Sequence, residues 1–173
     1  MRAGRYAQVG DQLWPAAFTR DSPRVALLGW GPQAPGPGFA WREARGGHWV
    51  REVARVECSR LVLVATSAYW LGEHPVEVLA VRPDGTADIV WAPDLAPTGS
   101  AHATALPGST AARRLHEDPD VGYRGHVPVD ELTTVTEAEH EVPVEPLPGH
   151  WSLPRPPRLP PSARGGTQAR ASR

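Results

Sequence analysis

Two stretches of the chain, residues 10–28 and 72–90, place turn residues and apolar residues in the same order. When 62 is subtracted from the second numbering, Gly72 falls on Gly10, and no gap is needed over 19 positions. The apolar residues Trp14, Ala16, Ala17, Phe18, Val25, Leu27 and Leu28 then fall on Val76, Val78, Leu79, Ala80, Ala87, Ile89 and Val90. Such an internal repeat predicts two copies of one small module. A chance match is the alternative, because any two alternating β sequences place apolar residues alike.

The repeat continues further along the chain at a second spacing. With an offset of 74, the matching pairs are Trp49 and Tyr123, Val53 and Val127, Glu57 and Glu131, Cys58 and Leu132, Ser59 and Thr133, and Leu61 and Val135. The change of offset falls in a loop region, where insertions cost little. Because neither copy alone buries much apolar surface, we predict that residues 1–66 and 67–142 pack together as one domain. The match with a leucine also predicts that Cys58 is a packed, apolar thiol.

Short apolar segments separated by turn residues predict β-strands through most of both copies. The predicted strands cover residues 5–9, 12–19, 25–28, 39–44, 61–70, 76–81 and 87–91. Residues 29–38 contain four Gly and three Pro, so we expect a loop there. Residues 50–58 fit a strand or a short helix, and residues 109–117 are the best helix candidate, with Ser109 or Thr110 as its cap. The predicted fold class is therefore mostly β (α+β), built from two tandem β-rich repeats with one short helix.

The C-terminal segment, residues 143–173, differs in composition from the rest of the chain. It is rich in Pro and Arg and has almost no aliphatic pattern, so we expect it to be extended or disordered. Its stretch LPRPPRLPP, residues 153–161, also has the composition of a polyproline ligand for an aromatic groove. A solubilising tail and a peptide ligand are the two interpretations of this segment.

The composition excludes several kinds of chemistry. The chain of 173 residues has a single cysteine, which excludes an internal disulfide and a thiolate metal cage. All 18 basic residues counted as Lys or Arg are arginines. The absence of lysine excludes a phosphate-loop lysine, a Schiff-base lysine and a kinase-type lysine.

Charge is distributed unevenly along the chain. Residues 1–71 have nine Arg and five acidic residues, whereas residues 72–142 have four Arg and thirteen acidic residues, a net charge of −9. The acidic middle repels phosphates and therefore argues against nucleic acid as a partner. It suits either a basic protein partner, whose approach it would steer, or a solvated acidic surface.

No motif in the sequence specifies a catalytic site, a cofactor site or a metal site. The seven histidines form no ligand pattern of known spacing, and no nucleophile elbow is present. The densest acidic and imidazole group is His116-Glu117-Asp118 with His126, and Glu137 and Glu139 form a further carboxylate pair. We therefore predict no catalytic residue, no cofactor, no metal and no enzymatic activity.

The location follows from two features of the sequence. The N-terminal stretch MRAGRYAQVG has no apolar region of the kind a secretion signal needs. The longest aliphatic run, residues 61–65, is far shorter than the roughly 20 residues that span a bilayer. We expect a cytoplasmic protein that does not contact membranes and that is a monomer or a weak dimer.

The stretches RAGRYAQVGDQLWPA, SAYWLGEHPVEV and AARRL…DPDVGYRGHVPVDELTTV resemble small actinobacterial immunity proteins of polymorphic toxin systems. They are most similar to the immunity factors for the tuberculosis-type necrotizing NAD-glycohydrolase toxins. The resemblance covers about 110 residues and follows a general pattern rather than a motif. It implies a cytoplasmic antitoxin that binds its toxin enzyme stoichiometrically and inhibits it, without catalysing a reaction.

The longest irregular segments of a β scaffold are the expected contact regions for a partner. With the acidic residues of the second half, they give the candidate partner-binding residues Trp30, Gln33, Phe39, Asp94, His102, Glu117, Asp118 and Asp120. Two other functions stay open. One is a β-rich interaction or scaffold module of another kind, and the other is a small enzyme that uses His116, Glu117 or the Glu137 and Glu139 pair.

Overall fold

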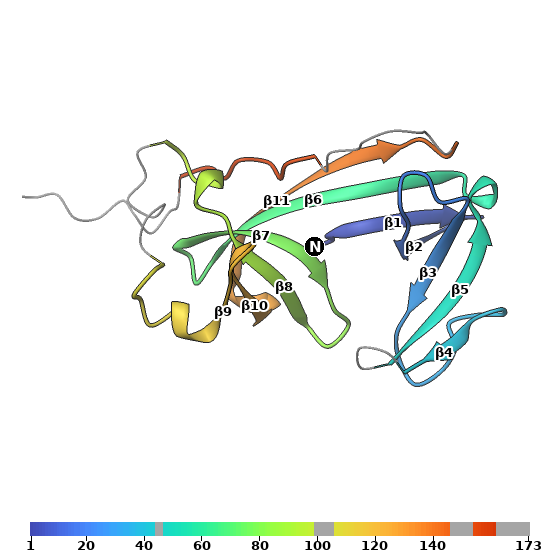
Figure 1. The fold of residues 1–173 in the computed structure, drawn as a ribbon, viewed down its shortest axis with the longest axis horizontal. Helices are drawn as coiled ribbons and strands as arrows, with labels where there is room; N and C mark the ends of the chain where they lie inside the picture. The colour runs from blue at the N-terminus through green and yellow to red at the C-terminus, as the bar shows by residue number, and fades with distance from the viewer. Residues whose placement is uncertain (44–46, 99–105, 146–153, 162–173) are drawn as a thin grey trace, which may run out of the picture. The chain divides into compact units, whose positions relative to one another are not determined.

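A computed structural model describes residues 1–43, 47–98, 106–145 and 154–161 of the chain (Figure 1). Strands account for 52% of the described residues, which confirms the prediction of a mostly β protein. The chain divides into two compact units. Unit 1 comprises Met1–Ala3, Ala65–Ala138 and Arg155–Arg173, and unit 2 comprises Gly4–Val64 and Glu139–Pro154. The packing of the two halves as one domain stays a prediction.

Unit 2 consists of five antiparallel strands followed by a 3-10 turn and the first part of a long strand. Its elements are β1 (Gly4–Val9), β2 (Gln12–Ala17), β3 (Arg24–Gly29), β4 (Ala40–Arg42), β5 (His48–Ala54), the turn η2 (Arg55–Glu57) and the first part of β6 (Arg60–Trp70). The strands pair in the order β4-β5-β3-β2-β1-β6. The tight turn between β1 and β2 uses Gly10, whose φ of 60° is available to glycine at little cost.

Unit 1 begins with the second part of β6 and continues with further strands. Its further elements are β7 (His74–Val81), β8 (Thr86–Trp91), the turns η3 (Pro93–Leu95) and η5 (Ala112–Arg114), β9 (His116–Asp118), β10 (Gly122–Pro128), the turn η6 (Val129–Glu131) and β11 (Leu132–Val142). The last four residues of β11, from Glu139 onward, belong to unit 2. The strands pair in the order β6-β7-β8-β10-β9, and β11 also pairs with β6.

The two units have the same succession of elements. The series β1, β2, β3, β4, β5, η2 and β6 in unit 2 has the counterpart β6, β7, β8, β9, β10, η6 and β11 in unit 1. The pairing order β4-β5-β3-β2-β1-β6 likewise has the counterpart β9-β10-β8-β7-β6-β11. Along the chain, β6 is therefore the last strand of one series and the first strand of the other.

The strand registers and the turn contacts correspond as well. The pair Ala16 and Leu27 has the counterpart Val78 and Ile89, and the pair Val25 and Val53 has the counterpart Ala87 and Val127. The Arg55 N–H donates to the Pro23 carbonyl at 2.8 Å, and the Val129 N–H donates to the Gly85 carbonyl at 2.9 Å. These partners stand at the offsets of 62 and 74 that align the sequence with itself.

Each unit has its own apolar core, formed by the inward faces of its strands. The core of unit 2 contains Ala7, Ala16, Phe18, Val25, Leu27, Val53, Cys58, Leu61, Leu63 and Val142. The core of unit 1 contains Ala3, Ala68, Trp70, Val76, Val78, Ala87, Ile89, Leu106, Ala111, Val127 and Leu132. Cys58 is 3% exposed and burial raises the pKa of its thiol, so it is the packed residue that its match with Leu132 predicts.

The predicted short helix over residues 109–117 is wrong. The helical part of this segment is the 3-10 turn η5 alone, and the Ala112 N–H donates to the Ser109 hydroxyl at 3.1 Å. Strand β9 follows immediately and pairs with β10, so the residues that a helix would need form a ladder instead. Local helix propensity is a weak preference, and tertiary strand pairing overrides it here.

The C-terminal segment was predicted to be extended or disordered, and its described part is extended. Residues 154–161 are extended and make hydrogen bonds to unit 1, and Leu159 is only 3% exposed. Residues 146–153 and 162–173 of the predicted tail lie outside the described residues.

Candidate functional site

The hairpin of β4 and β5 in unit 2 presents tryptophans to solvent. Strand β4 lies at the edge of the pairing order, and its three residues are all exposed. Trp41 on β4 is 45% exposed and pairs with Trp49 on β5. The two ring centroids are 5.2 Å apart in an edge-to-face arrangement, which favours a fixed orientation of Trp41.

The loop before β4 adds a third tryptophan to this surface. The Trp49 indole N–H donates to the Gly31 carbonyl at 3.1 Å and ties the loop to β5. Trp30, the neighbour of Gly31, is 38% exposed. Trp30, Trp41 and Trp49 together form what we call the tryptophan surface. Large exposed aromatic residues are unusual on a surface that contacts only water and are typical of binding sites.

A glycine allows Trp41 to lie flat on the hairpin. Gly47 has a φ of 82°, and a Cβ atom at this position would lie 2.2 Å from Cζ2 of Trp41. Any other residue at position 47 would therefore be strained and would also displace the tryptophan. The glycine at position 47 therefore leaves the space that the Trp41 ring occupies.

The candidate residues near this surface differ in their environments. Gln33 is exposed in the same loop as Trp30. Phe39 is half-buried, and its ring packs on Trp14 with centroids 5.0 Å apart, against the core of unit 2. Trp30 and Gln33 are therefore available to a partner, whereas Phe39 chiefly supports the loop. Trp41 and Trp49 were not among the residues predicted to bind a partner, although their places on either side of a Gly-containing turn were a signal in the sequence.

In unit 1, three of the candidate acidic residues lie together on the hairpin of β9 and β10. Glu117 and Asp120 are exposed, while Asp118 accepts a hydrogen bond from the Asp120 N–H at 3.0 Å and pairs with Arg124 at 3.2 Å. That backbone hydrogen bond and the Arg124 guanidinium lower the pKa of Asp118. The turn is closed by its own contacts, and Glu117 and Asp120 keep their charges free to face solvent.

The remaining two candidates lie apart from this hairpin. Asp94 is on η3 of unit 1, exposed, with its carboxylate 3.9 Å from the Arg155 guanidinium. Burial, together with the nearby charge of Asp94, raises the pKa of Glu77 on β7. His102 lies outside the described residues.

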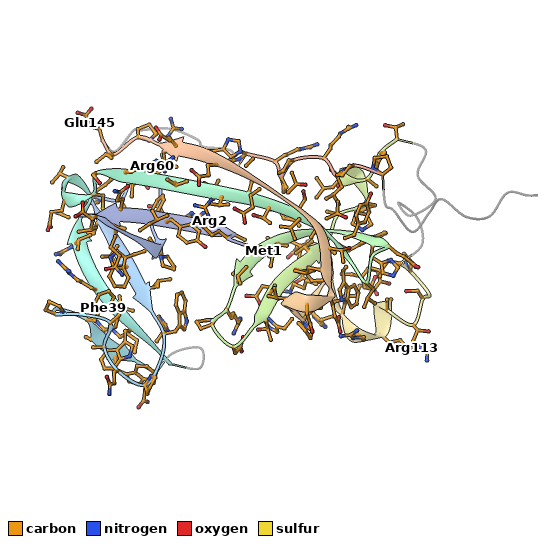
Figure 2. All side chains as sticks on the ribbon, turned by 180° about the vertical axis from the view of Figure 1, so that it is seen from behind. Met1, Arg2, Phe39, Arg60, Arg113 and Glu145 are labelled. Carbon is orange, nitrogen blue, oxygen red and sulfur yellow. The ribbon has the colours of Figure 1, made fainter. Side chains whose placement is uncertain are left out.

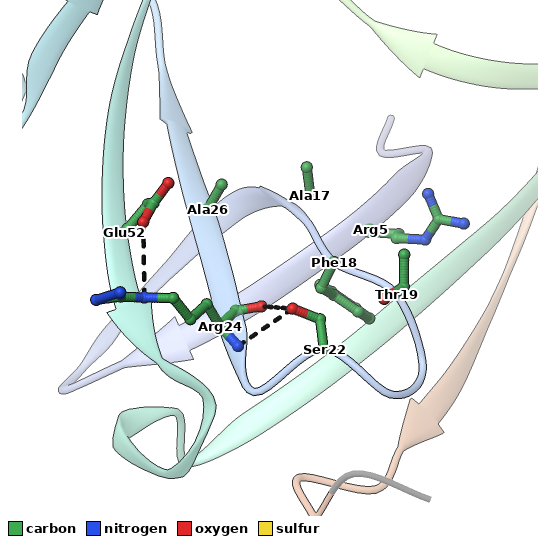
Figure 3. Close-up of a pocket in the computed structure, with 8 residues that line it drawn as sticks. All are labelled: Arg5, Ala17, Phe18, Thr19, Ser22, Arg24, Ala26 and Glu52. Carbon is green, nitrogen blue, oxygen red and sulfur yellow. Dashed lines mark hydrogen bonds and ion pairs between the residues drawn. The ribbon is translucent and has the colours of Figure 1, made fainter. Parts of the chain in front are cut away.

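A cavity of about 430 Å³ opens on unit 2, and Figure 3 shows its lining. The lining residues are Arg5, Ala17, Phe18, Thr19, Ser22, Arg24, Ala26 and Glu52. Arg24 is engaged, with its Nε 3.6 Å from Glu52. The Nε of Arg5 is buried and has no hydrogen-bond partner among the described residues. The lining contains neither an imidazole nor a thiol, so this depression does not present a nucleophile and base pair.

Two of the groups proposed for an enzymatic alternative, Glu137 and Glu139, are held in ion pairs. In unit 1, Glu137 accepts hydrogen bonds from the backbone N–H and the guanidinium of Arg2. In unit 2, Arg60 donates to Glu139 at 2.9 Å and to Glu141 at 2.8 Å, and Figure 2 shows Arg60 on β6 beside β11. Within the described residues, no group of three or more His, Cys, Asp or Glu side chains is placed to hold a metal ion.

Comparisons of the chain with protein-family models, with curated proteins and with solved structures found no match. In the described part of the chain, no helix has the length and apolar character needed to cross a membrane.

Proposed function

We propose that the protein acts by binding another protein through the tryptophan surface of unit 2. The observation that carries this proposal is the 45% exposure of Trp41 on an edge strand whose every residue is exposed. Trp and Arg are the residues most enriched among those that dominate binding energy, and Arg42 follows Trp41 on the strand. Because edge-to-face contact with Trp49 orders the ring in advance, little side-chain entropy is lost when a partner covers it.

Within the class of protein-binding proteins, we propose an immunity protein that inhibits a basic toxin enzyme. The resemblance of the sequence to actinobacterial immunity proteins supports this role. The net charge of −9 over residues 72–142 also supports it, because a negative surface speeds the approach of a basic partner. Glu117 and Asp120 are both exposed, so their carboxylates would attract the basic surface of such a partner.

We further infer that the chain arose as an internal duplication of one β module. The support is the matching order of elements and the matching registers in the two units. After duplication, the two equivalent hairpins acquired different surface residues. The Trp41 and Trp49 pair of unit 2 corresponds to the Glu117 and Tyr123 pair of unit 1, so one hairpin is aromatic where the other is acidic.

Affinity capture from the native host followed by an inhibition assay tests the function. The wild-type chain is used as bait beside Trp41→Ala and the control Leu79→Ala, since Leu79 is also 45% exposed but lies on β7 of unit 1. The proposal predicts that one protein is captured by wild type and by Leu79→Ala, and that Trp41→Ala captures at least tenfold less. Hot-spot residues cost about 2 kcal/mol or more on truncation, which is more than tenfold in affinity.

The captured protein is then purified and assayed for catalytic activity with increasing amounts of the chain. Loss of its activity at an equimolar ratio is the result expected of an immunity protein. Binding without loss of activity would favour the alternative of a scaffold module. Equal capture by wild type and Trp41→Ala would contradict the role of the tryptophan surface.

A further inference from the structure

Residues 154–161 lie on unit 1 as an extended segment held by hydrogen bonds from side chains and backbone. The Ser67 hydroxyl donates to the Pro157 carbonyl at 2.6 Å, and the Tyr69 hydroxyl donates to the Pro160 carbonyl at 2.8 Å. The Leu159 N–H donates to the Leu95 carbonyl at 2.8 Å. Figure 1 draws this segment in red.

The contacts follow the chemistry of a polyproline segment. Proline has no N–H, so the segment offers carbonyl oxygens, and two hydroxyls of unit 1 take up carbonyls that are three residues apart. Three residues make one turn of a polyproline helix, so Pro157 and Pro160 present their carbonyls on one side. Leu159 supplies the one backbone N–H that is used and buries its side chain to 3% exposure.

The receiving surface is buried beneath the segment. Ser67 and Tyr69 are 0% exposed, and Leu95 is 4% exposed. Burial raises the pKa of the Tyr69 phenol, which keeps it a neutral donor over the physiological range. If the segment left, two hydroxyls and an apolar side chain would lose their partner, and a buried unpaired donor costs about 1–3 kcal/mol.

Charge near the segment fits an arginine-bearing ligand. Arg155 and Arg158 are exposed, and the Arg155 guanidinium lies 3.9 Å from the Asp94 carboxylate. Glu77, on β7, lies opposite Ser67 in the ladder with β6 and adds a second acidic group close to Asp94. The carboxylates of Asp94 and Glu77 would attract arginines, and the hydroxyls of Ser67 and Tyr69 donate to proline carbonyls. The surface therefore favours a ligand that contains both prolines and arginines.

We propose that the surface formed by Ser67, Tyr69 and Leu95 is a binding groove for proline-rich, arginine-bearing peptides, and that residues 154–161 occupy it in cis. The ligand class is an extended peptide with two proline carbonyls three residues apart, a leucine before the second proline and an upstream arginine. A partner protein with such a segment would displace the internal one. The inference is independent of the tryptophan surface, which lies on unit 2.

The test uses the full chain and a fluorescein-labelled peptide with the sequence of residues 153–161, read by fluorescence polarisation. Leu159→Asp removes the buried leucine of the internal segment and should free the groove. We expect saturable binding of the peptide to the Leu159→Asp chain and at least tenfold weaker binding to wild type. A tethered segment competes at an effective concentration on the order of millimolar, which produces this difference.

The groove itself is tested by a second substitution in the freed chain. Tyr69→Phe keeps the ring and removes the hydroxyl that donates to Pro160. The loss of one hydrogen bond predicts a peptide affinity about three- to tenfold lower. Val121→Asp is the control, since Val121 is 48% exposed on the β9–β10 hairpin and should leave peptide binding unchanged. A peptide with Leu159→Asp should not bind either chain.

Equal peptide binding by wild type and the Leu159→Asp chain, or no binding by the latter, would overturn the proposal. If Leu159→Asp does not fold, hydrogen exchange on wild type decides the matter. The Leu159 amide should be protected in wild type, and the unlabelled peptide in excess should reduce that protection. An unprotected Leu159 amide, or protection that the peptide does not change, would overturn it.

Discussion

At the scale of single residues, Arg55 has a role that its position in the sequence did not indicate. Its side chain is 1% exposed, and its guanidinium donates to the carbonyls of Thr19, Ser22, Pro143 and Val144 at 2.7–3.3 Å. The equivalent residue of unit 1 is Val129. The corresponding position is therefore apolar in unit 1, whereas in unit 2 Arg55 connects the chain after β11 to the loop between β2 and β3.

Replacing Arg55 by methionine should destabilise unit 2. Four carbonyl groups lose a charged donor, and hydrogen bonds to charged groups contribute about 1.5–3 kcal/mol each, part of which water restores. We expect a loss of about 2–4 kcal/mol in the free energy of unfolding, measured by urea denaturation followed by tryptophan fluorescence. Arg42→Met, on a strand of unit 2 whose residues are all exposed, is the matched control. A midpoint that stays at the wild-type urea concentration would contradict this role.

Glu131 links stability to pH in unit 1. Its carboxylate accepts from Arg114 at 2.8 Å and from the buried Trp70 indole at 2.7 Å, and the Arg114 contact is the main reason that the pKa of Glu131 is lowered. A carboxylate with a lowered pKa in the folded state contributes stability above its unfolded pKa and loses it as pH falls through the folded pKa.

Wild type should therefore lose stability through this group as the pH falls below the ordinary pKa of a glutamate, about 4.3. Glu131→Gln keeps the shape and one acceptor but does not titrate, so its stability at pH 7 should be about 1 kcal/mol lower and should change less with pH. Urea unfolding at pH 7, 5, 4 and 3 provides the comparison. Parallel pH profiles for the two proteins would rule out the linkage.

At the scale of elements, the strands with alternating apolar residues were predictable, whereas the short strand β9 and the acidic strand β11 were not. Alternating apolar residues between turn signals give β1, β2, β3, β6, β7 and β8, because one face of each strand is buried. Strand β11 was missed because Glu137 and Glu139 were interpreted only as a carboxylate pair. Together with Glu141 they show a period of two, which is a strand signal, and Arg2 and Arg60 pair with these three carboxylates. The turn η5 was interpreted as a helix because propensity ignores the pairing of β9.

The hairpin of β4 and β5 depends on Gly47. Gly47→Ala places a Cβ atom in a left-handed backbone and against Trp41, which lies 2.2 Å from the ideal Cβ position. Strain of this kind costs about 1–3 kcal/mol. We expect a lower free energy of unfolding together with weaker partner binding, measured by urea denaturation and by calorimetric titration. Gly85→Ala, at φ 80° with no atom within 4 Å, is the control for backbone strain alone. An equal loss of binding in both variants would argue against the steric role of Gly47.

At the scale of the whole molecule, the offsets of 62 and 74 in the sequence correspond to the same order of strands in two units. The sequence alone did not show that the β4–β5 hairpin exposes its aromatic side chains to solvent. Exposure depends on what packs above each residue, and Trp14 and Trp41 look alike in the sequence although Trp14 packs on Phe39 and Trp41 faces solvent. The candidate site was thus half predicted: Trp30 and Gln33 came from the loop, and Trp41 came from the structure.

The uneven charge predicts salt-dependent association with a basic partner. Raising the ionic strength from about 0.05 M to 0.5 M shortens the Debye length and should lower the association rate constant at least tenfold, with little change in the dissociation rate. Surface plasmon resonance with the captured partner measures both rates. Replacing Glu117 and Asp120 by Gln and Asn should reduce the salt dependence. Association rates that are independent of salt would contradict electrostatic steering.

Site-specific photo-crosslinking in the native host tests the central claim most directly. A photoreactive amino acid is placed at position 33, in the loop of Trp30, so that all three tryptophans of unit 2 stay in place, or, as a control, at the exposed position 79 of unit 1. Binding through the tryptophan surface predicts one discrete crosslinked protein from position 33 and none of that product from position 79. No crosslinked protein from position 33, or the same product from both positions, would contradict the account.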